Sequence, residues 1–228
     1  MAESELRFPV GSSGKVSAVL TPSSGARWLY VFAHGAGAGM RHPFMTRVAG
    51  ALAQRGVATL RYQFPYMERK QRRPDPPAVA VLAVRAAVAA AAEAVPGIPL
   101  VAGGKSFGGR MTSTAQAEQP LAGVRGLAFF GFPLHPPGRP AMTRAQHLEQ
   151  VQVPMLFLQG DRDEFADQLL LRQVLRGLGK RATLHLEKDG DHSFSVPKRT
   201  GKTADAVLEE LATTFVDWAD RELLDTQN

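Results

Sequence analysis

Short apolar runs alternate along the chain with longer segments whose apolar residues recur at helical spacing. The short runs predict strands at residues 15–20, 28–33, 58–62, 100–103, 126–130, 155–159 and 183–187. The longer segments predict helices at residues 43–54, 79–94, 107–118, 165–178 and 204–221. Strands separated by helices are typical of a mostly parallel sheet covered by helices. We therefore expect one α/β domain over residues 1–228, with about seven strands and no large cap domain.

The composition permits one sizeable core, since 44% of the 228 residues are hydrophobic. There is no cysteine, which excludes disulfides, thiolate zinc sites and a cysteine nucleophile. The first residues carry Glu3 and Glu5 where a secretory signal would be basic, so a cytoplasmic location is the default expectation. The alanine-rich segment 78–95 contains Arg85 and Glu93, which favours a packed helix over a membrane span.

The chain is basic, with a formal net charge of +6. Five of the basic residues fall between positions 61 and 73, where they can attract acidic partners or simply keep a loop solvated. No known nucleic-acid-binding motif and no basic stripe with interleaved aromatic residues accompanies them. Nucleic-acid binding is therefore not expected.

The run that ends at Gly103 leads into Gly104-Lys105-Ser106-Phe107-Gly108, a G-x-S-x-G pattern between a strand and a helix. A sharp turn there exposes the serine hydroxyl and needs neighbours without side chains. The pattern nominates Ser106 as a nucleophile. A phosphate-binding loop is excluded because its first glycine would fall at position 99, which is Pro99.

Other candidate catalytic residues follow in a consistent order. Three acids, Asp161, Asp163 and Glu164, follow the strand at 155–159, and Asp191 and His192 follow the strand at 183–187. A glycine-rich segment, 34–39, follows the strand at 28–33. Because ligands bind beyond the carboxyl ends of parallel strands, all these segments are expected at one rim of the sheet.

On these motifs the chain resembles the α/β-hydrolase superfamily, in particular small serine hydrolases similar to dienelactone hydrolase. The matching segments are His34-Gly-Ala-Gly37, Phe64-Pro-Tyr66, Gly104-Lys-Ser-Phe-Gly108, Gly131-Phe-Pro-Leu-His-Pro-Pro137, Gly160-Asp-Arg-Asp163 and Asp191-His-Ser193. The resemblance implies an α/β-hydrolase fold in which Ser106 is the nucleophile and His192 is first the general base and then the general acid. In similar hydrolases the acid stands three residues after the glycine that ends its strand, which implies Asp163.

The resemblance also implies an oxyanion hole, formed by the N–H after the nucleophile and one N–H of the early glycine loop. These are Phe107 and Ala36, with Gly35 or Gly37 as alternatives for the loop donor. Asp161 is then a turn residue, and Asp191 an acceptor within its own loop.

Two irregular segments, 63–77 and 132–148, are either a substrate-facing rim or ordinary surface connections. His135, Arg61 and Arg110 are the candidate rim residues. If some of the basic residues face the pocket, they favour anionic or polar acyl groups; otherwise they only solvate the loop. The residues that carry this hypothesis are Arg61, Arg69, Lys70, Arg72, Arg73 and Arg110.

The sequence thus predicts a serine hydrolase that cleaves an ester-like bond of a small molecule (a carboxylic ester, lactone or thioester) through an acyl-enzyme. No cofactor is implied, and no spacing of His, Asp or Glu suggests a metal site. The alternative is a non-catalytic binding or scaffold protein of the same fold, because some relatives of this fold have lost activity.

Overall fold

The computed structural model describes residues 2–224, which contain one eight-stranded sheet in the order β1-β2-β4-β3-β5-β6-β7-β8. The strands β1 and β2 pair antiparallel, β2 pairs antiparallel with β4, and all further pairs are parallel. The strands are β1 (Ser4–Pro9), β2 (Lys15–Thr21), β3 (Trp28–Ala33), β4 (Val57–Tyr62), β5 (Leu100–Lys105), β6 (Val124–Phe130), β7 (Met155–Gly160) and β8 (Ala182–Glu187). This arrangement confirms a mostly parallel α/β sheet.

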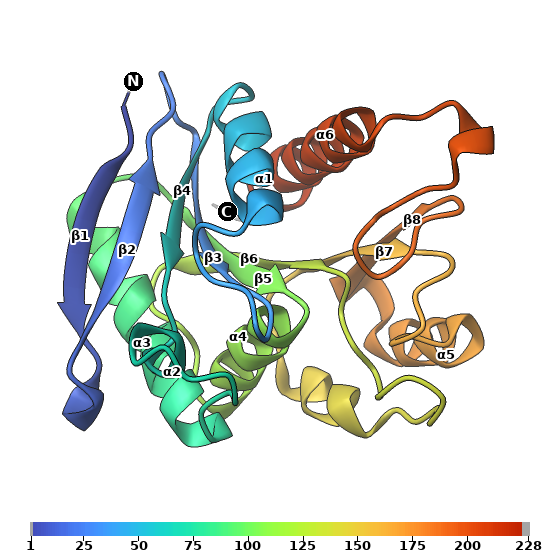
Figure 1. Cartoon of the computed structure of the whole chain (residues 1–228), viewed down its shortest axis with the longest axis horizontal. Coiled ribbons are helices and arrows are strands. Elements are labelled where there is room, and N and C mark those ends of the chain that lie inside the picture. The colour runs from blue at the N-terminus through green and yellow to red at the C-terminus, as the bar shows by residue number, and fades with distance from the viewer. Residues whose placement is uncertain (1, 225–228) are drawn as a thin grey trace.

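Helices cover both faces of the sheet (Figure 1). The two that pack on one face are α1 (Pro43–Ala53) and α6 (Ala204–Leu223). The opposite face is covered by α3 (Pro77–Ala94), α4 (Phe107–Glu118) and α5 (Gln168–Leu178). The short helical segments are η1 (Gly11–Ser13), α2 (Pro65–Glu68), η2 (Thr143–Gln150), η3 (Gly179–Arg181) and η4 (Lys198–Thr200).

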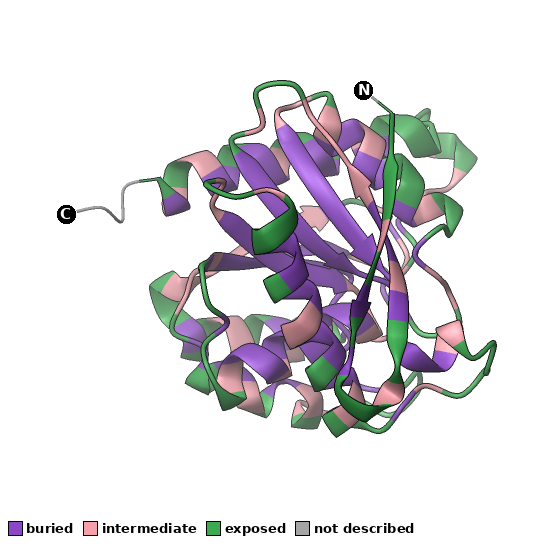
Figure 2. Ribbon diagram, turned by 90° about the vertical axis from the view of Figure 1, so that its left-hand side faces the viewer, coloured by how far each residue is buried: buried purple, intermediate pink, exposed green. Residues whose placement is uncertain are grey.

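The central strands are buried on both faces, so their sequences are continuously apolar instead of alternating. Every residue of β3 and β7 is buried, and the purple strands in Figure 2 lie between two layers of helices. One hydrophobic cluster packs on each face of the sheet. Because β3, β5, β7 and β8 run parallel, their carboxyl ends lie at the same end of the sheet. The loops at that end carry the candidate catalytic residues.

The strand β1 was not predicted from the sequence. Its six residues, SELRFP, alternate between charged and apolar side chains and include only one buried residue, Phe8. As an edge strand it has one neighbour, and charged side chains are a usual feature of such edges. The two irregular segments also contain short helices, α2 within 63–77 and part of η2 within 132–148.

The helix α3 is long and apolar enough to cross a membrane by length and composition alone. In the folded chain it lies on the sheet, and its small apolar residues contact β3 and α4. The residues that it buries are Ala80, Val81, Ala83, Val84, Ala87, Val88, Ala90 and Ala91. Its apolar composition is thus explained by burial in the core, as the sequence predicted.

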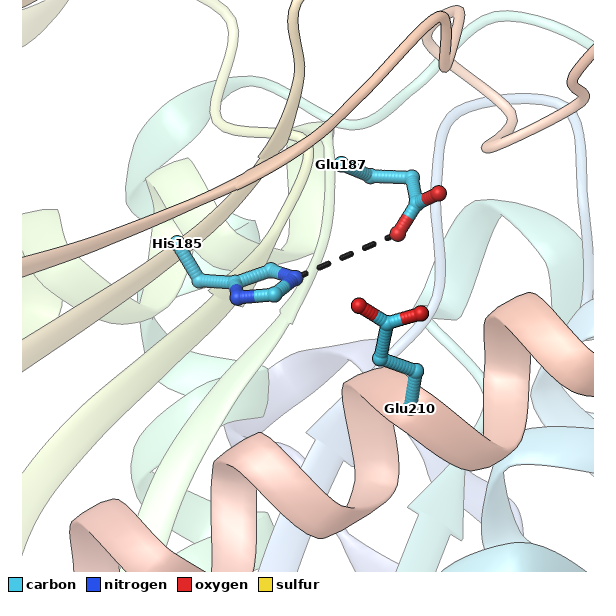
Figure 3. Close-up of side chains that lie close together, drawn as sticks. All are labelled: His185, Glu187 and Glu210. Carbon is cyan, nitrogen blue, oxygen red and sulfur yellow. Dashed lines mark ion pairs between the residues drawn. The ribbon is translucent and has the colours of Figure 1, made fainter.

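A polar cluster joins β8 to α6 (Figure 3). His185 and Glu187 lie on β8 with Nε2 and Oε2 4.0 Å apart, and Glu210 of α6 faces them. The Lys202 ammonium binds both carboxylates, at 2.9 Å from Glu187 and 2.7 Å from Glu210. Three side chains with metal-binding atoms therefore meet here, but a lysine already supplies the positive charge that the two carboxylates need.

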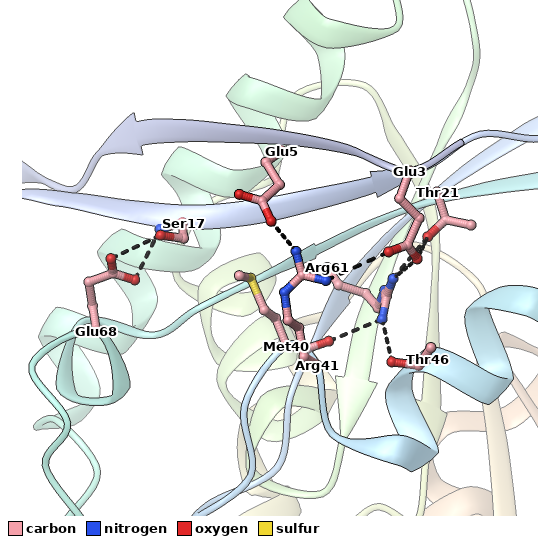
Figure 4. Close-up of polar contacts among 9 residues, drawn as sticks. All are labelled: Glu3, Glu5, Ser17, Thr21, Met40, Arg41, Thr46, Arg61 and Glu68. Atoms are coloured by element: carbon pink, nitrogen blue, oxygen red, sulfur yellow. Dashed lines mark hydrogen bonds and ion pairs between the residues drawn. The ribbon is translucent and has the colours of Figure 1, made fainter. Parts of the chain in front are cut away.

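Arg61, a candidate rim residue, instead connects β4 to the antiparallel edge of the sheet (Figure 4). Its side chain is fully buried and forms an ion pair with Glu3. It also donates to the Thr46 hydroxyl at 2.9 Å and to the Thr21 hydroxyl at 3.0 Å. The rim expectation does not hold for this residue, because a buried guanidinium must find its partners inside the protein.

Arg61→Met should lower the free energy of unfolding by about 1–3 kcal/mol, because it removes an ion pair and several hydrogen bonds from a buried position. Urea denaturation followed by circular dichroism measures this change. The control is Arg72→Met, an exposed site at which the change should stay within about 0.5 kcal/mol. An unchanged midpoint for Arg61→Met, together with altered substrate selectivity, would restore the rim interpretation.

Candidate functional site

Ser106 stands at the turn between β5 and α4, with φ +50° and ψ −114°. A non-glycine residue at such dihedrals is strained and is held there by its surroundings. A Cβ atom on either Gly104 or Gly108 would lie 2.5 Å from the Ala33 carbonyl oxygen. The two glycines of the motif therefore let the turn pass directly against the end of β3.

Ser106, His192 and Asp163 form one hydrogen-bonded chain. The Ser106 Oγ lies 2.9 Å from His192 Nε2, and His192 Nδ1 lies 2.7 Å from Asp163 Oδ2. The carboxylate accepts from Nδ1, which leaves Nε2 free to accept the serine proton. Residues from three separate loops thus meet in the geometry that activates a serine hydroxyl.

Two other nearby acids lie away from the His192 ring. Glu164 is exposed, and the Asp191 carboxylate accepts the N–H groups of Ser193 and Ser195, at 2.7 and 2.9 Å. The structure therefore places Asp163 against His192, and Asp191 within its own loop.

Gln159 fixes the Asp163 carboxylate, a contact that sequence reasoning missed. Its amide nitrogen donates to Asp163, while its carbonyl oxygen accepts the Phe132 N–H at 2.8 Å. The Phe165 N–H donates to the other carboxylate oxygen of Asp163 at 2.8 Å. A polar residue at the end of the otherwise apolar strand 155–160 is the signal that could have identified it.

Burial lowers the pKa of His192 below its usual value, which favours the neutral imidazole. The hydrogen bond that His192 donates to Asp163 acts in the opposite direction and raises the pKa, and the nearby Lys105 ammonium lowers it. The Phe165 ring covers the imidazole at a centroid distance of 4.3 Å. These neighbours keep water from part of the ring.

The glycine-rich loop 34–39 lies beside Ser106 and is anchored by His34. Burial lowers the pKa of His34 to about 4, so this imidazole is neutral near pH 7. Its Nδ1 pairs with the Gly35 carbonyl at 2.8 Å, and its Nε2 accepts the Phe64 N–H at 3.1 Å. The Gly37 N–H donates to the Tyr66 hydroxyl at 3.2 Å, so it is already engaged. Ala36 and Gly35 remain as candidate donors toward a substrate.

A cavity of about 500 Å³ opens next to this chain of residues. Ser106, His192 and Ala36 line it, together with apolar side chains of α1 and α6 that include Phe44 and Leu208. Two basic side chains, Lys105 and Arg47, also line the cavity. The cavity can therefore hold a small, largely apolar molecule against the Ser106 hydroxyl.

Two further candidate rim residues lie outside this cavity. His135 is buried, and its Nε2 accepts the Asp167 N–H at 2.9 Å, which fixes the segment before α5. The Arg110 guanidinium lies over the Phe107 ring at 5.9 Å. None of the six basic residues of the anion hypothesis lines the cavity.

A family model described as an alpha/beta hydrolase domain matches residues 26–220. The chain belongs to the α/β-hydrolase family. The match covers every element from β3 to most of α6, and with it Ser106, Asp163 and His192. The eight-stranded sheet agrees with an α/β-hydrolase fold without a cap domain.

Solved structures of other α/β hydrolases share this fold along almost their whole length. A dienelactone hydrolase from Anabaena variabilis is 21% identical with a TM-score of 0.76, and the alignment covers 97% of this chain and 98% of that one. A serine hydrolase without a lid from Xanthomonas campestris is 22% identical with a TM-score of 0.75, over 99% and 97%. An α/β serine hydrolase homologue from Coxiella burnetii is 20% identical with a TM-score of 0.75, over 95% and 97%.

Gly108→Ala should destabilise the Ser106 turn by about 1–3 kcal/mol or more, because the added methyl group would meet backbone atoms of β3. Thermal unfolding measures the loss. Gly177→Ala in α5 is the matched control, since a Cβ atom there meets nothing within 4 Å and alanine favours a helix by about 0.5–1 kcal/mol. A Gly108→Ala protein as stable as the parent would contradict the tight contact.

Proposed function

We propose that this α/β hydrolase is a serine hydrolase that cleaves an ester-like bond through a covalent acyl-enzyme. The observation that carries the proposal is the hydrogen-bonded chain from Ser106 through His192 to Asp163 at the wall of a cavity. Its family membership supports hydrolase chemistry in general. The serine mechanism and the ester-like substrate are the proposal itself.

The proposed reaction uses His192 twice. The Ser106 Oγ attacks the carbonyl carbon of the substrate while His192 Nε2 takes the hydroxyl proton, and Asp163 stabilises the imidazolium. The same proton then passes to the leaving alcohol or thiol, and the acyl group remains on Ser106. A water molecule then loses a proton to His192 and attacks the acyl-enzyme, and the acid is released as His192 returns the proton to the Ser106 Oγ.

The proposed oxyanion hole consists of the Phe107 and Ala36 N–H groups. Phe107 is the first residue of α4, so its N–H has no partner within the helix. The start of a helix also carries partial positive charge, which favours a developing oxyanion. Ala36 contributes from the loop beside Ser106, where the Gly37 N–H is already bound to Tyr66.

The proposed substrate is a small carboxylic ester, lactone or thioester. The volume of about 500 Å³ and the apolar side chains of α1 and α6 favour a compact molecule with limited polarity. The reaction needs no cofactor, since the nucleophile, the proton acceptor and the oxyanion donors all come from the chain. A cytoplasmic location belongs to the same proposal.

A fluorophosphonate probe should label Ser106 covalently, because it reacts with activated serines in pockets of many shapes. Mass spectrometry of the digested protein locates the adduct. Ser106→Ala should lose both the adduct and the hydrolysis of p-nitrophenyl acetate, yet keep the parent's circular dichroism spectrum. If the folded parent protein does not react, the non-catalytic alternative is favoured; if Ser106→Ala retains turnover, another nucleophile is responsible.

Asp163→Asn should lower kcat by about 10⁴-fold, because the amide no longer fixes the correct imidazole tautomer or stabilises the imidazolium. Asp161→Asn is the matched control two residues away and should have a far smaller effect. Steady-state kinetics with the same ester measures both variants. A large loss at Asp161 or Glu164, with Asp163→Asn unaffected, would assign the role to that neighbour.

A further inference from the structure

The side chain of Lys105 extends from the residue before Ser106 to the loop that carries His192. Its ammonium donates a hydrogen bond to the main-chain carbonyl of His192. It also lies over two aromatic rings, 5.6 Å from the Phe44 centroid and 5.4 Å from the Phe194 centroid. A carbonyl and two ring faces are a favourable environment for a cation that has lost part of its water.

Lys105 differs from two other cations of the chain, the buried Arg61 and the exposed Lys202. Arg61 and Lys202 form ion pairs with carboxylates. Among residues 2–224, no carboxylate lies within ion-pair distance of Lys105. A desolvated cation without such a partner costs free energy, and it is retained here next to the proposed general base.

We propose that Lys105 is a positioning residue for His192: its ammonium fixes the His192 loop to the Ser106 turn and keeps the imidazole in its neutral form. This inference rests on the proposed function. Lys105 lines the cavity, and its hydrogen bond goes to the His192 loop. It acts on the reaction through the place and the protonation state of His192.

The mechanical part of the proposal follows from chain connectivity. Lys105 and Ser106 are consecutive, so the bond to the His192 carbonyl joins the proposed base to the strand that carries the proposed nucleophile. Other contacts also hold the loop: the Asp191 carboxylate binds two of its N–H groups, the Arg162 N–H donates to the Gly190 carbonyl, and the buried Phe194 ring stacks on Phe44. Lys105 supplies a contact to the main chain of His192, whose ring is bound by Asp163.

The space around the ammonium fits a lysine closely. A Cβ atom on Gly131 would lie 2.7 Å from Lys105 Nζ and 3.3 Å from His192 Nδ1. Gly131 also has φ +67°, a conformation in which other residues are strained. A bulkier guanidinium would compete for the same space beside the imidazole.

The electrostatic part depends on all charged groups near His192. Asp163 on the neighbouring loop and Asp191 on the same loop favour the imidazolium, and Lys105 opposes it. Arg47 of α1 and His42 line the same cavity, and Arg47 forms an ion pair with Asp205. Burial lowers the pKa of Lys105 to about 8, while the two aspartates raise it, so the lysine is mostly charged at neutral pH. The positive charge of Lys105 therefore favours the neutral His192 imidazole, which can accept the serine proton.

Two variants test this proposal. Lys105→Met removes the charge and the donor but keeps a long side chain that fits between the aromatic rings. Lys105→Gln removes the charge and retains an N–H donor one atom nearer the main chain. Lys198→Met is the control, since it removes one positive charge from an exposed position six residues after His192.

The first readout is the His192 pKa, followed by NMR titration of the imidazole C–H signal and assigned by its loss in His192→Gln. Both Lys105 variants should raise this pKa by about 0.5–1 unit, because a neighbouring positive charge has been removed. The control should leave it unchanged. An unmoved His192 pKa in both folded Lys105 variants would overturn the proposal.

The second readout is the pH profile of kcat/KM with p-nitrophenyl acetate. The acidic limb of this profile should move to higher pH by the same amount in both variants. The plateau value of kcat/KM should fall about tenfold in Lys105→Met and less in Lys105→Gln. Because the NMR titration needs no turnover, it separates the two proposals. If the His192 pKa shifts in the Lys105 variants but the parent protein does not label at Ser106, the Lys105 role is supported and the hydrolase mechanism is contradicted. If Ser106 labels but the His192 pKa does not shift, the hydrolase mechanism is supported and the Lys105 role is contradicted.

Discussion

The close approach of the Ser106 turn to the end of β3 is the contact on which the rest of the site depends. Gly104 and Gly108 allow the main chain to pass against the Ala33 carbonyl, where even one methyl group would collide. This approach brings the proposed nucleophile beside the glycine-rich loop that follows Ala33. It also starts α4 at Phe107, directly after Ser106.

The protein places its charged side chains in two kinds of environment. Away from the cavity, Arg61 is paired with Glu3, and Lys202 with two glutamates, so their charges are balanced locally. Beside the cavity, Asp163 and Lys105 act on the pKa of a single imidazole in opposite directions. The carboxylate stabilises the imidazolium that the proposed reaction forms, whereas the ammonium favours the neutral form that begins it. A base needs both states within reach at neutral pH, which opposing neighbours provide.

The basic segment 61–73 shows why charge in a sequence is weak evidence for a ligand. Its basic residues lie close together in the chain, yet Arg61 is buried and pairs with Glu3, and Arg69 pairs with Asp75. Lys70 and Arg72 line a different hollow, beside α2. The lysine that reaches the candidate site comes instead from within the G-x-S-x-G motif.

The sequence by itself determined the layered α/β fold and the central strands, because a strand buried on both faces must be continuously apolar. It also determined that Ser106, the acid cluster and His192 lie at one edge of the sheet, since each follows the carboxyl end of a parallel strand. The edge strand β1 did not emerge, because its single buried residue leaves no apolar run. Only the tertiary structure decided which of the neighbouring acids faces His192, that Gln159 and Lys105 support that site, and that Arg61 and His135 do not line the cavity. These outcomes depend on the direction of each side chain and on contacts between distant loops. A shift of one residue in a loop changes which side chain reaches the site, yet it leaves the pattern of apolar and polar residues unchanged.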